Sequence, residues 1–198
     1  LPPILRSTGI TAIDFDGDRD LDLHVSCYQS ADFLLRNDGG LVFVDVTSEV
    51  GLDVPIAADA GTGCAWADYD GDGDLDLALA NYTSQTTLPN ALFRNDGGVF
   101  TDVAPELGLD DSQPTLQVVW LDIDDDGDQD LYVGADRGQG GPFRNRMFRH
   151  AGDGTFAAGT DAIGPGDDAT RRVLLADVNG DSHLDAVVAN MPGQNSVY

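Results

Sequence analysis

The stretch that decides the fold is Asp14-Phe-Asp16-Gly-Asp18-Arg-Asp20-Leu-Asp22, which places an aspartate at every second residue. The same pattern starts again at Asp68, Asp122 and Asp177, after intervals of 54, 54 and 55 residues. Two like charges about 4 Å apart repel by about 4 kcal/mol at an effective dielectric constant of 20. We therefore expect a chain that repeats this arrangement four times at one period to form four cation sites.

Composition limits the classes of function. The chain has 198 residues, enough for one domain with a sizeable core. It carries 35 acidic against 10 basic residues, a net charge of −25, and all but two of the acids are aspartate, which is favoured in turns and ligand loops. Nucleic acid is not expected as a partner because no basic stripe could neutralise phosphates. No membrane span is expected, because long apolar runs are absent.

Each repeat has the pattern of four antiparallel strands. One apolar stretch precedes the acidic loop and another follows it, as in 63–67 and 75–80. A third segment ends in Asn-Asp-Gly-Gly, at Asn37 and Asn95, and a fourth strand follows. Because Asn and Gly tolerate positive φ, this is a hairpin-turn sequence. No segment shows helical periodicity, so four-stranded units at a period near 55 predict an all-β fold of β-propeller blades.

We expect about three and a half blades in a single partial propeller region, 1–198. The blades are predicted at about 8–52, 61–109, 115–160 and 171–198, the last of them incomplete. Propellers usually close with four to eight blades. The chain, which begins with Leu1 rather than Met, is therefore expected to be a piece of a larger propeller or to close a ring by self-association.

The two cysteines, Cys27 and Cys64, fall in adjacent repeats, so they are expected either to form a disulfide or to be two buried thiols. Val118 and Val173 fill the position of Cys64 in later repeats, which suits a core site.

The acidic loops offer only oxygen ligands. Counted from the first aspartate, positions 1, 3, 5 and 9 offer side-chain oxygens, and position 7 is expected to offer its backbone carbonyl. Oxygen sites with several carboxylates favour Ca²⁺ over Mg²⁺ or Zn²⁺. An EF-hand would need glutamate at position 12, which here is an apolar strand residue. The predicted ligands of four Ca²⁺ sites are Asp14, Asp16, Asp18, Asp20, Asp22; Asp68, Asp70, Asp72, Asp74, Asp76; Asp122, Asp124, Asp126, Asp128, Asp130; and Asp177, Asn179, Asp181, His183, Asp185, with Asp20, Asp74, Asp128 and His183 binding through the backbone carbonyl.

The Asp-x-Asp-Gly-Asp-x-Asp-Leu-Asp loop after a short strand resembles the calcium loop of FG-GAP/VCBS repeats, the blade type of integrin α-subunit propellers. The segments 35–52 and 93–109 resemble the cartilage acidic protein (ASPIC/UnbV-type) branch and bacterial VCBS-repeat proteins. The third repeat departs with Asp125 in place of Gly, and the fourth with Asn179 and His183. The sequence departs from the family pattern in lacking the Phe-Gly and Gly-Ala-Pro motifs that give the repeat its name. The resemblance implies a calcium-binding β-propeller, secreted or at the cell surface, that serves adhesion.

The acidic loops and the Asn-Asp-Gly-Gly turns are expected on one face, where Ca²⁺ has a structural role. The opposite face is expected to bind a protein or carbohydrate ligand, since loops on rigid scaffolds carry function. One of its loops concentrates Arg137, Arg144 and Arg146, which suit a carboxylate, a sulfated glycan or an acidic loop; pairing with nearby aspartates is the alternative.

Catalysis is not expected, because the chain has no nucleophile motif, zinc spacing or phosphate loop. The alternative is the propeller domain of a metal-dependent lyase or dehydratase, since some similar propellers occur in such enzymes. His24 is expected to be a packed strand residue, His150 to occupy a hairpin turn, and Trp66 and Trp120 to pack between blades.

Overall fold

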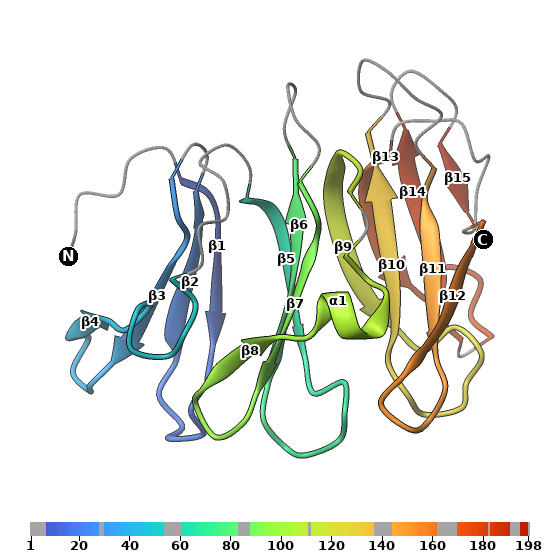
Figure 1. Ribbon diagram of the computed structural model, residues 1–198. Coiled ribbons are helices and arrows are strands. Elements are labelled where there is room, and N and C mark those ends of the chain that lie inside the picture. Colours follow the sequence, from blue (N-terminus) through green and yellow to red (C-terminus); the bar gives the residue numbers. More distant parts are fainter. Residues whose placement is uncertain are drawn as a thin grey trace.

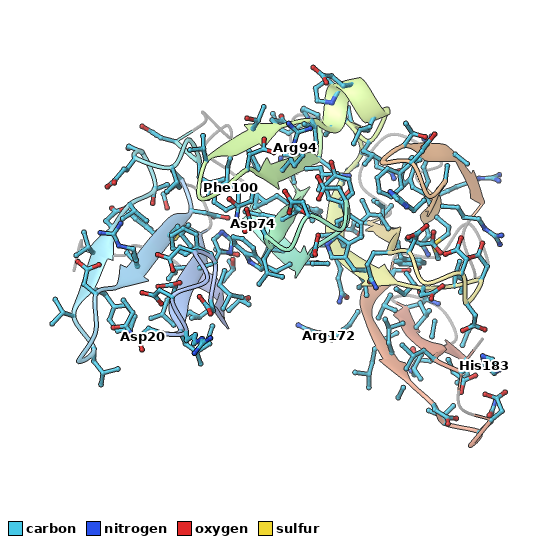
Figure 2. The ribbon with its side chains drawn as sticks, turned by 90° about the horizontal axis from the view of Figure 1, so that it is seen from below. Asp20, Asp74, Arg94, Phe100, Arg172 and His183 are labelled. Carbon is cyan, nitrogen blue, oxygen red and sulfur yellow. The ribbon has the colours of Figure 1, made fainter. Side chains whose placement is uncertain are left out.

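The computed structural model describes residues 7–27, 30–53, 61–82, 88–110, 112–136, 144–161, 170–181, 183–190 and 195–197. Nearly all of their regular structure is β-strand, in four separate antiparallel sheets. The sheets stand side by side in chain order (Figure 1) and follow an open arc when viewed from below (Figure 2). The prediction of an all-β chain of propeller blades is confirmed, and none of the sheets in these ranges closes on itself.

Each sheet consists of strands that are consecutive in the chain, and we call the sheets blades 1 to 4. Their strands are, in blade 1, β1 (Ser7–Ile13), β2 (Asp22–Cys27), β3 (Phe33–Asn37) and β4 (Phe43–Asp45); in blade 2, β5 (Gly61–Ala67), β6 (Asp76–Asn81), β7 (Ala91–Asn95) and β8 (Phe100–Asp102); in blade 3, β9 (Thr115–Leu121), β10 (Asp130–Ala135), β11 (Arg146–His150) and β12 (Phe156–Asp161); and in blade 4, β13 (Thr170–Ala176), β14 (Asp185–Asn190) and β15 (Ser196–Val197).

The strand registers repeat from blade to blade, so equivalent positions can be identified by their partners. Phe33, Ala91, Arg146 and Ser196 pair with equivalent residues of the second strand in blades 1 to 4. Blade 4 therefore includes two residues of a third strand, Ser196 and Val197, at the position where the repeat pattern expects that strand.

The hydrophobic core lies between neighbouring blades. Trp120 of β9 stacks on Tyr69 of the β5–β6 loop, with ring centroids 5.9 Å apart and an angle of 1° between the ring planes. The indole nitrogen of Trp120 donates to the carbonyl oxygen of Ala65, at 3.3 Å. Trp66 of β5 in blade 2 contacts His24 of β2 in blade 1 edge to face, with ring centroids 5.5 Å apart. The predicted packing role of both tryptophans is confirmed, with Trp120 buried and Trp66 partly buried in the core.

A glycine allows blades 2 and 3 to approach closely. A Cβ atom at Gly63 of β5 would lie 2.9 Å from the carbonyl oxygen of Leu116 in β9. Since that neighbour is backbone, any side chain at position 63 would push the two strands apart.

One short helix, α1 (Ala104–Leu107), follows β8 and is not expected from the sequence. Pro105 suits the first turn because its φ is already helical and its missing N–H is not needed there. Gly108 ends the helix in the left-handed conformation and donates its N–H to the carbonyl oxygen of Ala104. A helix of four residues is too short to produce a hydrophobic period.

Both cysteines are free thiols in the structure, so the disulfide alternative is not realised. Cys27 is buried in blade 1, as the other alternative expects, whereas Cys64 of β5 is partly exposed.

Candidate metal centres

The acidic loops join the first and second strands of their blades and lie at the lower end of the sheets (Figure 1). The turn between the third and fourth strands lies beside the loop of the same blade, since Gly97 donates its N–H to Asp74 Oδ2 at 2.8 Å. Figure 2 looks onto this end and shows Asp20, Asp74 and His183 spaced along the arc. The loops and the Asn-Asp-Gly-Gly turns share one face, as predicted.

Each loop folds around its own carboxylates. In the second loop Asp68 Oδ2 accepts the N–H of Gly73 at 3.0 Å, and Asp72 Oδ1 accepts the N–H of Asp74 at 2.9 Å. Equivalent bonds recur in the first and third loops. Gly71 has a φ of 76°, and in the third loop Asp125 takes its place with a φ of 59°. Aspartate tolerates this region better than most residues, which explains the departure in the third repeat.

Three loops bring three carboxylate oxygens together, each within 4.8 Å of the other two. Ca²⁺ binds oxygen at about 2.3–2.6 Å, so two ligands on opposite sides of one ion lie about 5 Å apart at most. The donors therefore fit a shared Ca²⁺, and Asp14 Oδ1 is buried with no hydrogen-bond partner in the described part of the chain. The groups are Asp14, Asp16 and Asp18; Asp68, Asp70 and Asp76; and Asp122, Asp124 and Asp130.

The fourth loop differs from the other three. Its position-3 residue, Asn179, donates its amide N–H groups to Asp181 Oδ2 at 3.0 Å and to Asp185 Oδ1 at 3.3 Å. In the second and third loops the carboxylates at positions 3 and 9 belong to one close group, whereas the described residues of the fourth loop contain no such group. Of the four predicted sites, three therefore have geometric support.

The side chain at position 7 is directed away from its own loop in the fourth repeat. His183 Nδ1 lies 2.7 Å from Asp125 Oδ2 of the third loop, and both side chains are exposed. This contact fits the expectation that position 7 would bind a cation through its backbone, and it links the loops of blades 3 and 4.

The aspartate at position 9 has a structural role that sequence reasoning missed. Asp76 is fully buried, and its two oxygens accept the N–H groups of Tyr69 at 3.0 Å and Asn95 at 2.8 Å. It therefore ties the acidic loop to the end of the third strand, and Asp22 and Asp130 make the same pair of bonds. The sequence contains a signal for this role, because position 9 is aspartate in all four loops and always begins a strand.

Burial raises the pKa of Asp76 to about 7, and the hydrogen bonds from Asn95 and Tyr69 offset only part of that effect. In the unfolded chain an aspartate has a pKa of about 4. Between these values the folded state holds a proton that the unfolded state has released, so stability falls as pH rises.

We therefore expect the free energy of unfolding of metal-free protein to include a contribution from Asp76 that falls by up to about 4 kcal/mol between pH 4 and pH 7. Urea unfolding at several pH values, with Asp76→Asn as the variant that does not titrate there, measures this contribution as a difference. Equal pH slopes for the two proteins would contradict it.

The three arginines proposed as ligand contacts are only partly described. Arg137 lies outside the described residues. Arg144 and Arg146 are exposed at the start of β11, at the end of the blade opposite the acidic loops, and both have interaction partners.

The structure changes the expectations for two histidines. His24 is a buried strand residue, as predicted, but it has the polar neighbours Asp32 and Cys64, which sequence reasoning missed. His150, expected in a hairpin turn, is instead the last residue of β11 and is buried.

A family model described as an FG-GAP-like repeat matches residues 14–79, 68–133 and 122–188, so that each match includes two successive acidic loops. No curated protein matches the chain. Consecutive four-stranded sheets, each with an acidic loop between its first two strands, define a β-propeller-like repeat module. The chain belongs to the FG-GAP repeat family. Such repeats are typical of extracellular proteins, and no helix in the described ranges is long and apolar enough to cross a membrane.

Proposed function

We propose that this chain is a calcium-binding β-propeller module of a secreted or cell-surface protein, with a binding surface for a protein or carbohydrate ligand. The observation that carries the calcium assignment is the convergence of three carboxylate oxygens in each of three loops. Asp68, Asp70 and Asp76 would hold the ion in the second loop. When bound, the ion supplies positive charge among side chains that otherwise repel one another.

Calcium has a structural role in this proposal, because neighbouring loops contact one another. Asn95 at the end of β7 donates to the carbonyl oxygen of Phe15 in the first loop, at 3.2 Å, and to that of Leu75 in its own loop, at 3.1 Å. Ordering one loop therefore also orders the contact between blades. An ion that binds the folded state and not the unfolded state stabilises the fold by mass action.

The ligand surface is assigned to the end of the blades opposite the acidic loops. The loops there join rigid strands, the setting in which binding residues commonly occur. The calcium assignment fits the proposed extracellular location, because calcium modules outside cells have dissociation constants of about 10⁻⁴–10⁻³ M.

Calorimetric titration of metal-free protein with Ca²⁺ tests the proposal. Because the amide of Asn179 donates to Asp181 and Asp185, we expect three sites that bind more tightly than the fourth. Asn179→Asp adds a carboxylate at position 3 and is expected to tighten the fourth site by about tenfold, or 1.4 kcal/mol.

Asn195→Asp is the matched control, because it adds the same charge in the same blade but outside the loop. Its equivalent in blade 1 is Asp32, so aspartate suits the position. Absence of calcium binding by the wild-type protein would overturn the proposed function. Binding that Asn179→Asp leaves unchanged, or that Asn195→Asp tightens equally, would overturn only the assignment of the fourth loop.

A further inference from the structure

A histidine, an aspartate and a cysteine meet where blades 1 and 2 pack together. His24 Nδ1 of β2 lies 3.3 Å from Cys64 Sγ of β5, and His24 Nε2 lies 3.5 Å from Asp32 Oδ2. Thr11 of β1 places its hydroxyl 3.5 Å from the same sulfur. The imidazole is 1% exposed, so both of its ring nitrogens face protein groups rather than bulk water.

The internal repeats show that this cluster is a local departure from the blade pattern. By strand register, Cys64 corresponds to Val118 and Val173, and His24 corresponds to Ala78, Tyr132 and Val187. The corresponding residues in the other two contacts between blades therefore form no such group.

Asp32 departs from the pattern in the same place. Its equivalents Asn90, Asn145 and Asn195, like Asp32 itself, accept a backbone N–H from the last residue of the second strand. The amide groups of Asn90 and Asn145 also donate to a threonine of the next blade. A carboxylate cannot make that donor bond, and Asp32 Oδ2 instead lies beside His24. Three polar departures that are separate in the sequence thus form one cluster, in which His24 lies between Asp32 and the sulfur of Cys64.

The surroundings favour a reactive thiol over an inert one. Burial would raise the pKa of the Cys64 thiol, but His24, together with Thr11 and Ser26, lowers it below the ordinary value. Cys64 is partly exposed and can meet small reagents, whereas Cys27 is buried. The cavity lined by His24 and Asp32 has a volume of only about 10 Å³, roughly one water molecule, which leaves no room for a substrate there.

We propose that Cys64 is a site of covalent modification, a nucleophilic thiol that takes hydrogen peroxide and small alkylating electrophiles as its reaction partners. His24 is the positioning residue on the sulfur, and Asp32 holds the far side of the imidazole. Thiol reactivity follows the thiolate, which a hydrogen-bonded imidazole favours.

The reaction with peroxide balances without another reactant. The Cys64 sulfur attacks one peroxide oxygen with an electron pair, the S–O bond forms and the O–O bond breaks. The leaving hydroxide takes up the proton released by the thiol and becomes water. Sulfur loses two electrons to peroxide, and the product is a sulfenic acid.

Alkylation rates of the native protein with iodoacetamide at pH 7, measured for each cysteine by peptide mass spectrometry, test the proposal. We expect Cys64 to react about tenfold or more faster than N-acetylcysteine, because a free thiol of pKa about 8.5 is only slightly ionised at this pH. Cys64→Ser should remove the fast reaction, and Cys27→Ser should keep it. Dimedone should trap a sulfenic acid on Cys64 after brief exposure to peroxide.

Two variants that restore residues found in other blades separate the positioning role from a structural one. His24→Ala introduces alanine, the residue found at the equivalent position of blade 2. Asp32→Asn keeps a side-chain oxygen that accepts the N–H of Cys27. Both are expected to slow the reaction of Cys64 and to reduce its thiolate absorbance, while circular dichroism stays unchanged. If His24→Ala does not fold, the rate measured for Asp32→Asn still tests the proposal. A Cys64 that reacts no faster than N-acetylcysteine, or at an unchanged rate in the folded variants, would overturn the proposal.

Discussion

Replacing Asp76 with alanine is expected to lower the free energy of unfolding by about 2–4 kcal/mol, even when no metal is present. The substitution leaves the N–H groups of Tyr69 and Asn95 buried without an acceptor. Each buried N–H group without an acceptor costs about 1–3 kcal/mol of stability. The substitution also removes the cost of burying a carboxylate, which offsets part of the loss. The effect is large because one side chain satisfies backbone groups of two separate segments.

Asp72→Ala is the control for this prediction. Asp72 belongs to the same loop, but it is exposed and accepts only the N–H of Asp74. Urea unfolding in chelator, followed by tryptophan fluorescence, should show a loss of less than about 1 kcal/mol for Asp72→Ala. Equal losses for the two variants in chelator would show that Asp76 has no structural role beyond that of its loop.

Calcium is expected to raise the melting temperature by about 15–30 °C over its value in chelator. At a concentration of 100 times the dissociation constant, one site contributes about 2.7 kcal/mol. Three sites then contribute about 8 kcal/mol, and a domain of this size gains about 2–4 °C per kcal/mol. For sites with a dissociation constant near 10⁻⁴ M, about 10 mM Ca²⁺ meets this condition.

Matched salts decide whether this stabilisation is specific. Added NaCl also weakens repulsion in a chain with a net charge of −25, so the melts are compared at equal ionic strength. Mg²⁺ retains more of its water and prefers fewer carboxylates, so its effect should be much smaller than that of Ca²⁺. An equal rise with NaCl would mean that the loops respond to screening alone, and an equal rise with Mg²⁺ would mean that the sites do not select Ca²⁺.

Much of the fold can be predicted from the sequence, because its signals are local and repeated. The Asn-Asp-Gly-Gly turns at Asn37 and Asn95 and the apolar runs beside each loop define strands that pair with their neighbours in the chain. The helix α1 could not be predicted in this way, since it is one turn long and depends on Pro105 and Gly108.

The candidate ligands of each loop also lie close together in the sequence, but their arrangement in space cannot be predicted from it. In the sequence, position 9 differs from the other loop aspartates only in standing at the start of a strand, and burial of Asp76 against the end of β7 is what separates its structural role from cation binding. In the fourth loop, the side chain of Asn179 has an oxygen that could bind a cation. In the structure, however, its amide nitrogen is the group that faces Asp181.

The sequence by itself determined the repeat, the strand order within a blade and the presence of oxygen-rich loops, because each of these depends on residues close together in the chain. Only the tertiary structure decided which carboxylates converge, and only it brought His24, Asp32 and Cys64 together. The physical reason is that these contacts depend on the packing of separate segments: His24 meets Cys64, 40 residues away in the next blade, and Asp76 is buried against the end of β7, 19 residues away.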